Sequence, residues 1–213
     1  MRITVVYDNE VKRVGLRKGH GFSALIEDEG VPPLLFDTGA DGPTLLHNMR
    51  ELNIDPRDVE TIVISHAHDD HTGGLSEILR TNKVAELYLP SSFKRVFPDR
   101  KVTEVKHPVQ IRKNVFSTGE LEGVEQSLVL KTAKGVFLLT GCAHPGVEKI
   151  LAVAARFGEL YGIAGSFHGF RDFKLLQGLS FVCPCHCTKY KQEIQDLFRD
   201  RTMECGVGSV IEL

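Results

Sequence analysis

Short runs of apolar residues, separated by polar turns, recur along the chain and predict a protein rich in strands. The first run covers residues 1–7, and the polar residues 8–18 that follow predict a loop. Residues 24–27 and 34–37 predict a hairpin across the turn 29–33, where glycine and proline gather. Further strands are predicted at residues 61–64, 85–89, 102–105, 114–117, 128–131, 136–139, 179–182 and 207–211.

Apolar positions at helical spacing predict helices between these strands. The first begins at Asp41, which can cap it, carries Pro43 in its first turn, and ends before residues 53–56. Its apolar stripe consists of Leu45, Leu46, Met49 and Leu52. Other helical stretches are predicted at residues 72–79, 145–156 and 189–198.

The alternation of strands and helices predicts an α/β fold, and the second half of the chain repeats the plan of the first in outline. A layered sandwich fits this order, with two mixed sheets face to face and helices outside. Periodicity alone does not separate such a sandwich from an ordinary doubly wound fold. Because the 213 residues contain no visible linker, we expect a single domain, residues 1–213.

Composition narrows the class of protein. A formal net charge of −2 argues against a dedicated nucleic-acid binder, which normally carries a basic surplus. No apolar stretch approaches the length of a membrane span, so we expect no membrane partner. The chain begins at once as a strand, without the pattern of a signal peptide, and we therefore expect a cytoplasmic protein.

The five cysteines do not resemble a disulfide framework, and we expect reduced thiols. Three of them stand at alternate positions, Cys183, Cys185 and Cys187, beside a histidine. An alternative is a zinc–thiolate site, although the only distant cysteines are Cys142 and Cys205.

The densest chemistry lies in the heptapeptide 65–71, SHAHDDH, which directly follows the apolar run 61–64. In an extended stretch His66 and His68 point to the same side, so the two side chains can share a metal ion. A turn at Asp69 would bring Asp70 and His71 to the cluster from the opposite flank, which leaves room for a second ion. Imidazole and carboxylate ligands suit zinc, and equally iron(II) or manganese.

Three further histidines stand where predicted strands end. His144, His168 and His186 each follow an apolar run and lie close to glycine or proline. Such strand ends can converge on one edge of a layered sandwich, as they do in open α/β sheets. We therefore expect these histidines to approach the heptapeptide.

The heptapeptide, the Gly73-Gly74 pair after it and the upstream Asp37 resemble the signature of the metallo-β-lactamase superfamily. Segments 18–23, 140–146, 165–169 and 184–188 are similar to one subgroup, named for 7,8-dihydropterin-6-methyl-4-(β-D-ribofuranosyl)aminobenzene 5′-phosphate synthase. The resemblance implies a four-layer αβ/βα sandwich of the metallo-β-lactamase type. It also implies two divalent metal ions, zinc in the first place with iron or manganese as alternatives.

The ligands implied by this resemblance are His66, His68, Asp70, His71 and His186. The chain departs from the common superfamily pattern at two places, because Cys142 stands where a bridging aspartate is expected and Glu125-Gln126 replaces an earlier histidine. Two interpretations stay open. Either His144 completes the ligand set of the first ion and Cys142 lies outside it, or Cys142 binds a metal directly; we favour His144.

Other residues receive supporting roles on the same basis. Asp70 binds one ion and can also take a proton, and His168 and His20 are candidates for contact with a substrate, His168 also as an acid. Asp37 is expected to hold the metal loop as an acceptor behind the ligands. Lys189 and Lys191 are candidates for receiving a phosphate, with a solvated helix face as the alternative explanation.

Three functions follow from these expectations. The first is a metal-dependent hydrolase that acts on a small phosphorylated or ester-like substrate. The second, implied by the subgroup, is a transferase that joins a dihydropterin methyl diphosphate to a ribofuranosyl-aminobenzene phosphate and releases diphosphate. The third is a metal-bound sensor without turnover. The sequence leaves the oligomeric state open.

Overall fold

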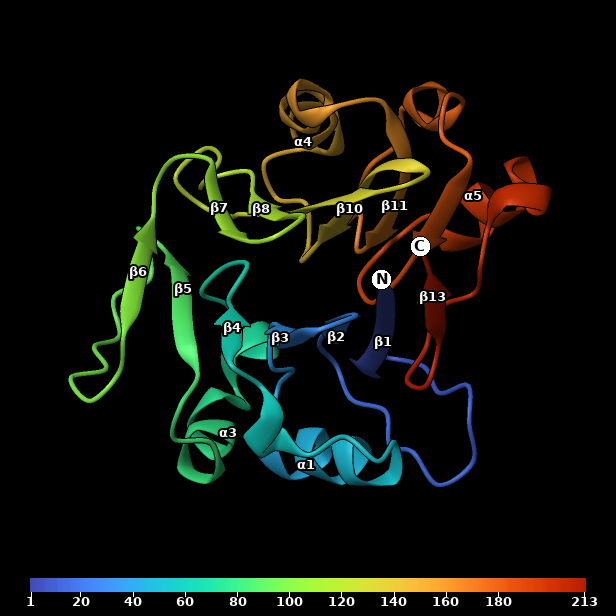
Figure 1. Cartoon of the computed structure of the whole chain (residues 1–213). Coiled ribbons are helices and arrows are strands. Elements are labelled where there is room, and N and C mark those ends of the chain that lie inside the picture. Colours follow the sequence, from blue (N-terminus) through green and yellow to red (C-terminus); the bar gives the residue numbers. More distant parts are fainter.

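Two β-sheets lie face to face in the computed structural model, which describes residues 1–213 (Figure 1). The first sheet has seven strands in the order β13-β1-β2-β3-β4-β5-β6, and the second has six in the order β12-β11-β10-β9-β8-β7. The strands of the first sheet are β1 (Arg2–Tyr7), β2 (Ser23–Asp28), β3 (Val31–Phe36), β4 (Thr61–Val63), β5 (Glu86–Pro90), β6 (Val102–Val105) and β13 (Val210–Glu212). Those of the second are β7 (Val109–Arg112), β8 (Val115–Ser117), β9 (Leu128–Thr132), β10 (Gly135–Thr140), β11 (Leu160–Gly165) and β12 (Phe181–Pro184).

Helices cover the outer faces of both sheets, so the chain forms four layers. Figure 1 shows α1 (Gly42–Glu51) and α3 (Leu75–Thr81) below the first sheet and α4 (Val147–Ala154) above the second. The short α2 (Asp69–Thr72) follows the histidine-rich loop, and α5 (Lys191–Leu197) lies beside the second sheet. Four 3₁₀ turns complete the elements: Pro56–Asp58, Ala155–Phe157, Phe173–Leu176 and Arg199–Arg201. The predicted α/β sandwich is confirmed.

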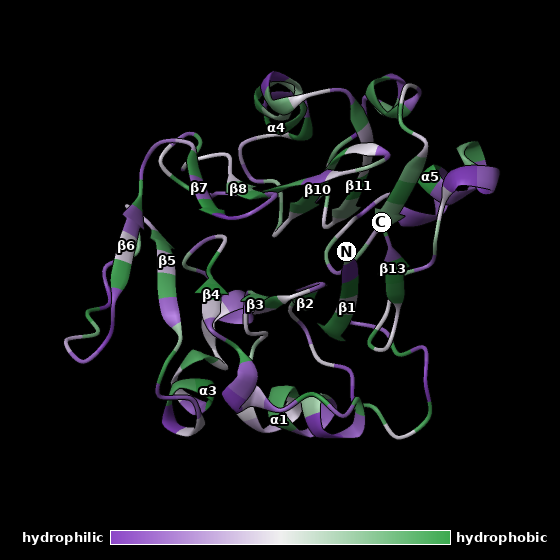
Figure 2. Ribbon diagram, viewed as in Figure 1, coloured by the Kyte–Doolittle hydropathy of each residue, from purple (hydrophilic) through white to green (hydrophobic).

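Three apolar clusters hold these layers together. The largest fills the space between the sheets, where Phe22, Phe36 and Phe137 are fully buried. The second joins the first sheet to α1 and α3, and the third joins the second sheet to α4 and α5. Figure 2 shows the same division, with mostly hydrophobic strands and with hydrophilic stretches on α1 and α5. The central strands of each sheet are therefore covered on one face by the other sheet and on the other face by helices, which is why their sequences are apolar on both faces.

Several predicted boundaries are wrong, for local reasons. Strand β3 begins at Val31, inside the predicted turn, because its register with β2 shifts near its prolines and β4 pairs with it only from Leu34 onward. Helix α4 begins two residues later than predicted, since Gly146 has φ = 99°, outside helical geometry. Helix α5 starts at Lys191 and β13 at Val210, each later than predicted.

Two strands were given no bounds from the sequence. Strand β11, with the sequence LYGIAG, is the apolar run expected before His168; its two glycines weaken the pattern, and parallel pairing with β10 and β12 places it inside the sheet. Strand β7, with the sequence VQIR, is a half-polar edge strand.

The expectation of reduced thiols throughout is wrong for one pair. Cys185 and Cys205 form a disulfide, with Cα atoms 5.1 Å apart. The segment after α5 folds back along β12, where the Met203 amide donates to the Val182 carbonyl, and this return brings Cys205 to Cys185. Such a pairing depends on tertiary structure that cysteine spacing does not reveal.

None of the helices combines the length and the apolar character that crossing a bilayer requires.

Candidate metal centre

Loops that follow the C-terminal ends of β1, β4, β10, β11 and β12 meet at one edge of the molecule, here called the loop rim. Residues of the loop rim come from segments 8–9, 65–71, 141–144, 166–168 and 185–188. Four groups of three possible metal-binding residues lie there, with the ligand atoms of each group within 4.8 Å of one another. They are His66/His68/His144, His66/His71/Cys142, Cys142/His186/Cys187 and His20/Asp70/His186.

The loop after β4 brings its histidines together by two different backbone geometries. His66 and His68 lie in extended backbone, and His66 Nε2 is 3.0 Å from His68 Nδ1, as the alternation of side chains predicted. Helix α2 then begins, with His68 at its N-cap position, and turns His71 back into the interior. The rings of His66 and His71 are 4.2 Å apart between centroids.

Asp37 fixes this loop from beneath. Its Oδ1 accepts from the Ser65 amide at 2.7 Å, and its Oδ2 accepts from the Ser65 hydroxyl at 2.6 Å and from His71 Nδ1 at 2.7 Å. Asp37 is fully buried and has φ = 58°, a conformation that non-glycine residues adopt at a cost when tertiary contacts hold it. The structure thus places Asp37 behind the histidines, where its predicted supporting role requires it.

These contacts decide which imidazole nitrogen faces the loop rim. Because the Ser65 hydroxyl donates to Asp37, His66 Nδ1 donates to Ser65 Oγ at 2.8 Å, and His66 Nε2 keeps its lone pair. His71 Nδ1 donates to Asp37, so His71 Nε2 keeps its lone pair and lies 3.2 Å from Cys142 Sγ. A hydrogen-bonded Nδ1 with an available Nε2 is the arrangement that metal-binding histidines adopt.

A second buried carboxylate, Glu125, fixes the loop after β10. It accepts from the backbone amides of Cys142, Ala143 and His144, each at 2.9 Å. The His144 ring thereby lies 4.8 Å from that of His66 and 4.9 Å from that of His68. His144 Nε2 is buried and has no hydrogen-bond partner.

The unpartnered nitrogen of His144 tests whether the residues of the loop rim fit a metal ion. A buried polar atom without a partner is costly, and lone-pair nitrogens of His66 and His68 lie in the same group. Three imidazole donors converging on one point form a ligand set that zinc accepts. The residues present therefore fit a divalent cation.

His186 approaches from the loop after β12 and is held on two sides. Its amide donates to Asp8 Oδ2 at 2.9 Å, and its Nδ1 donates to Asn9 Oδ1 at 2.8 Å. Its Nε2 lies 3.1 Å from Asp70 Oδ2, which is also 3.3 Å from His20 Nε2. His186 has φ = 40°, so this strand end, like Asp37, is strained at the site.

The charges at the loop rim are unevenly distributed in the protein without metal. Burial lowers the pKa of His66 far below its ordinary value, and the neighbouring His71 and His144 lower it further. Burial also lowers the pKa of His144. The hydrogen bond from His186 lowers the pKa of Asp70 despite partial burial. Burial opposes protonation of His186, but its bonds to Asp70 and Cys187 outweigh burial and raise its pKa to about 9. Neutral imidazoles thus stand beside an ion pair.

The remaining predicted residues lie at different distances from the clustered histidines. His20 and His168 are exposed on the solvent side of the loop rim, here called the mouth, and the His168 ring lies 5.0 Å from that of His144. The Lys189 amide donates to the His168 carbonyl, and its side chain extends over the Tyr190 ring. Lys191 Nζ lies 2.8 Å from Glu10 Oε1. This ion pair accounts for the presence of Lys191, which is therefore not a free cation for a phosphate.

Sequence reasoning missed several residues that position the site. Asp8 and Asn9 end an apolar strand, the same signal that identified the histidines, and could have been found by it. Glu125 gave no such signal, because its contacts are to backbone amides 17–19 residues away. Cys187 lies at the loop rim, whereas Cys183 and Cys185 pack between the sheets, so the three alternate cysteines do not form one zinc site.

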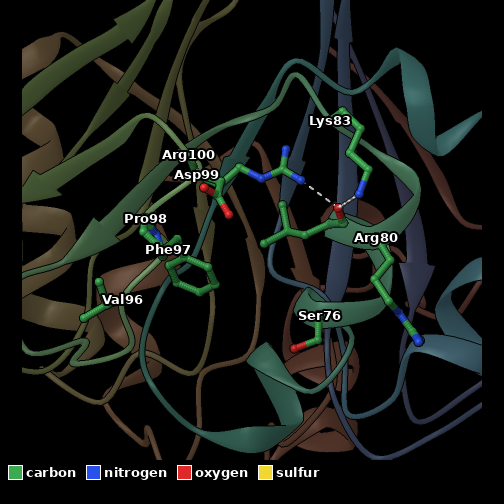
Figure 3. Close-up of a pocket in the computed structure, with 9 residues that line it drawn as sticks. Ser76, Arg80, Lys83, Val96, Phe97, Pro98, Asp99 and Arg100 are labelled. Atoms are coloured by element: carbon green, nitrogen blue, oxygen red, sulfur yellow. Dashed lines mark hydrogen bonds between the residues drawn. The ribbon is translucent and has the colours of Figure 1, made fainter.

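A cavity of about 390 Å³, shown in Figure 3, lies away from these residues and is lined by α3 and the loop before β6. Arg100 donates to the Leu79 and Asn82 carbonyls there, and Lys83 also reaches the Leu79 carbonyl. These cations cap the C-terminal end of α3, which accounts for their presence without a ligand.

Comparisons with known proteins agree with the geometry. The family model of the metallo-beta-lactamase superfamily matches residues 16–144, more than half of the chain. The chain is 26% identical to 7,8-dihydropterin-6-methyl-4-(β-D-ribofuranosyl)-aminobenzene-5′-phosphate synthase of Methanocaldococcus jannaschii, over 91% of the chain and 90% of that protein. An uncharacterised protein of the same organism is 27% identical over 81% of the chain and 85% of its own length.

Solved structures share the fold over the full length. Tm1679, described as a metal-dependent hydrolase of the β-lactamase superfamily, superposes with a TM-score of 0.80 at 27% identity, covering 100% of this chain and 99% of its own. Zinc-bound PqqB of Methylobacterium extorquens superposes with a TM-score of 0.66, covering 100% of each chain, and its 11% identity supports the fold alone.

Proposed function

This chain belongs to the metallo-β-lactamase superfamily, as its motifs predicted, and from that premise we propose that it is a metal-dependent hydrolase with two divalent cations at the loop rim. The observation that carries the proposal is the buried, unpartnered Nε2 of His144, together with the grouping of an imidazole nitrogen of His144 with those of His66 and His68 within 4.8 Å. Zinc is the first candidate for the metal, with iron(II) and manganese as alternatives.

The donor groups divide between two positions. His66, His68 and His144 would hold the first cation. Asp70, His71 and His186 would hold the second, since Asp70 Oδ2 lies within 3.8 Å of the Nε2 atoms of both histidines. His144 and Cys142 need not compete, because their ligand atoms belong to different groups.

Two divalent cations would supply an activated water near neutral pH and charge neutralisation at a leaving oxygen. Asp70 is part-exposed beside His20 and His186, and its lowered pKa keeps it ionised, so its carboxylate can hold the attacking water by a hydrogen bond and pass a proton on to His20 or solvent. His168 stands at the mouth with a positive φ of 46° and can donate a hydrogen bond, or a proton, to the substrate. His20 can do the same beside Asp70.

The open mouth suits a small anionic substrate. His20, His68, His168 and Lys189 are all exposed around it. Lys189 adjoins His168 through the backbone and is the candidate for contact with a phosphate. We therefore propose a phosphoester or similar ester as substrate, with water as the acceptor.

Metal analysis and turnover test the proposal together. We expect gently purified protein to carry close to two cations per chain and to hydrolyse a chromogenic phosphoester, thioester or lactone. His68→Ala should reduce turnover by more than the ~100-fold that loss of an outer partner costs. The exposed His107, away from the loop rim, supplies the matched control His107→Ala, which should change neither metal content nor turnover. Metal bound without turnover on any of these probes, and without transfer in the incubation described below, would indicate a sensor instead.

A second candidate, transfer, is favoured by the relative named as a dihydropterin synthase. Incubation with a dihydropterin methyl diphosphate, with and without the ribofuranosyl-aminobenzene phosphate, separates the two. Diphosphate released only with acceptor present indicates transfer, whereas release without acceptor indicates hydrolysis.

A further inference from the structure

Two thiols face each other at the centre of the loop rim. Cys142 Sγ and Cys187 Sγ are 3.4 Å apart, although 45 residues separate them in the chain. His186 Nε2 belongs to the same group, and His71 Nε2 lies 3.2 Å from Cys142 Sγ. Cys142 is thus grouped both with His66 and His71 and with His186 and Cys187.

The two sulfurs are in contact but not bonded to each other. Two thiolates bound tetrahedrally to zinc at ~2.3 Å lie about 3.8 Å apart, whereas the sulfurs of a disulfide are at about 2.05 Å. The 3.4 Å observed is that of a hydrogen bond between two thiols, and a small separation of the sulfurs would let one cation bind both. The pair also differs from Cys185 and Cys205, which are bonded to each other elsewhere in the fold.

The three donors are held in place by separate partners. The Cys142 amide donates to Glu125, and Ser166 Oγ lies 2.8 Å from Cys187 Sγ. His186 Nδ1 donates to Asn9, which aims Nε2 inward. Cys142 and His186 are buried, and Cys187 is half-buried, so little water competes for the position. Preorganised, partly dry donors are what a metal position requires.

We propose that the second cation position of this chain is a thiolate position, held by Cys142 and Cys187 together with His186, so that the two sulfurs replace Asp70 and His71 in the ligand set given above. This inference rests on the proposed function, because it assigns ligands to the same binuclear centre. Two thiolates supply the negative charge that a bridging carboxylate would otherwise bring. Because thiolates are soft ligands, the position selects zinc, cobalt(II) or cadmium over magnesium, manganese or calcium.

Cobalt(II) reconstitution of the intact protein under anaerobic conditions tests the assignment. Visible d–d bands report tetrahedral cobalt at either position, and a near-ultraviolet sulfur-to-cobalt charge-transfer band reports thiolate ligands. We expect that band in the wild type, about half of its intensity at saturating cobalt in Cys142→Ser and in Cys187→Ser, and its loss in the double variant, with the second cobalt bound more than ~100-fold more weakly there. Cys183, a free thiol buried between the sheets, supplies the matched control Cys183→Ala, which should keep the band.

The outcomes separate this inference from the proposed function. Visible bands without a charge-transfer band would overturn the thiolate position and leave the binuclear centre standing. Neither kind of band would overturn both. Should the serine variants fail to fold, zinc X-ray absorption of the wild type decides: sulfur at about 2.3 Å supports the assignment, and nitrogen or oxygen alone at about 2.0 Å overturns it.

Discussion

Each half of the molecule fixes its ligand loop with one buried carboxylate, but the two carboxylates work in different ways. Asp37, at the end of β3, reaches the loop after β4 and contacts a serine hydroxyl, an imidazole and one backbone amide. Glu125, between β8 and β9, reaches the loop after β10 and contacts only backbone amides. Their exposed fractions are 0% and 1%, so neither interaction is weakened by solvent.

This difference bears on what each loop can tolerate. Asp37 restricts which residues can occupy positions 65 and 71, because it needs the Ser65 hydroxyl and His71 Nδ1 as hydrogen-bond donors. Glu125 leaves the side chains of residues 142–144 free, since backbone amides are common to all residues but proline. A thiol can therefore stand at Cys142 without disturbing the loop, which gives a structural reason why the second half departs from the superfamily pattern and the first half does not.

Removal of Asp37 should have the largest effect. Asp37→Ala leaves the Ser65 and His71 donors buried without an acceptor, and we expect a loss of about 3–5 kcal/mol in the free energy of unfolding. Urea unfolding of the metal-free protein measures it, and metal content should fall as well. The exposed neighbour Asp69 supplies the control Asp69→Ala, for which a change above about 0.5 kcal/mol would argue against a specific role of Asp37.

Glu125→Gln should cost less and act mainly on stability. The glutamine side chain keeps one oxygen as acceptor but turns its NH₂ group toward at least one backbone N–H. We expect this to lower the free energy of unfolding by about 1–3 kcal/mol. Because no ligand side chain contacts Glu125, cobalt affinity at the first position should change less than in Asp37→Asn, where the acceptor of His71 is altered. Equal losses of affinity in the two variants would contradict the division of roles.

The sequence predicted the part of the site that is local. Residues 65–71 carry their ligands within one loop, so the alternation of His66 and His68 sufficed to pair them. The approach of His144 and His186 was expected only because both follow apolar runs. Glu125 could not be assigned, because its role arises from contacts between segments far apart in the chain. Asn9 stands at a strand end and Cys187 in the cysteine–histidine run, so for these two only the distant partners could not be predicted.

The fold shows the same limit. Strands with continuous apolar runs were identified, whereas the glycines of β11 and the half-polar sequence of β7 concealed two strands that only pairing with neighbours reveals. The Cys185–Cys205 disulfide likewise depends on the return of the chain along β12.

Gly141 lies between the two carboxylates and offers a smaller perturbation of both. A Cβ there would meet the Ser65 hydroxyl and approach Glu125 Oε1, so only a hydrogen fits. We expect Gly141→Ala to cost about 1 kcal/mol, because the Ser65 side chain can shift at the expense of its bond to Asp37. Gly169, with open space around it, supplies the control Gly169→Ala. Thermal unfolding of both variants measures the difference, and similar midpoints would show that the two loops are not tightly packed at this point.

The ion pair between Asp70 and His186 joins the two halves directly and should show the smallest effect, about 1 kcal/mol at most, since Asp70 remains part-exposed. In the metal-free protein the pKa of Asp70 lies below its ordinary 3.8, so its contribution to stability is present above that pH and is lost as the pH falls through the lowered value. The pKa of His186 is raised from 6.5 to about 9, so its contribution is complete below pH 6.5 and is lost as the pH rises through about 9.

The difference in free energy of unfolding between wild type and Asp70→Asn should therefore be greatest between about pH 4 and 6.5 and shrink on both sides. Urea unfolding from about pH 3 to about pH 10 measures it, and a difference that stays constant up to about pH 10 would mean that Asp70 does not stabilise the protonated form of His186.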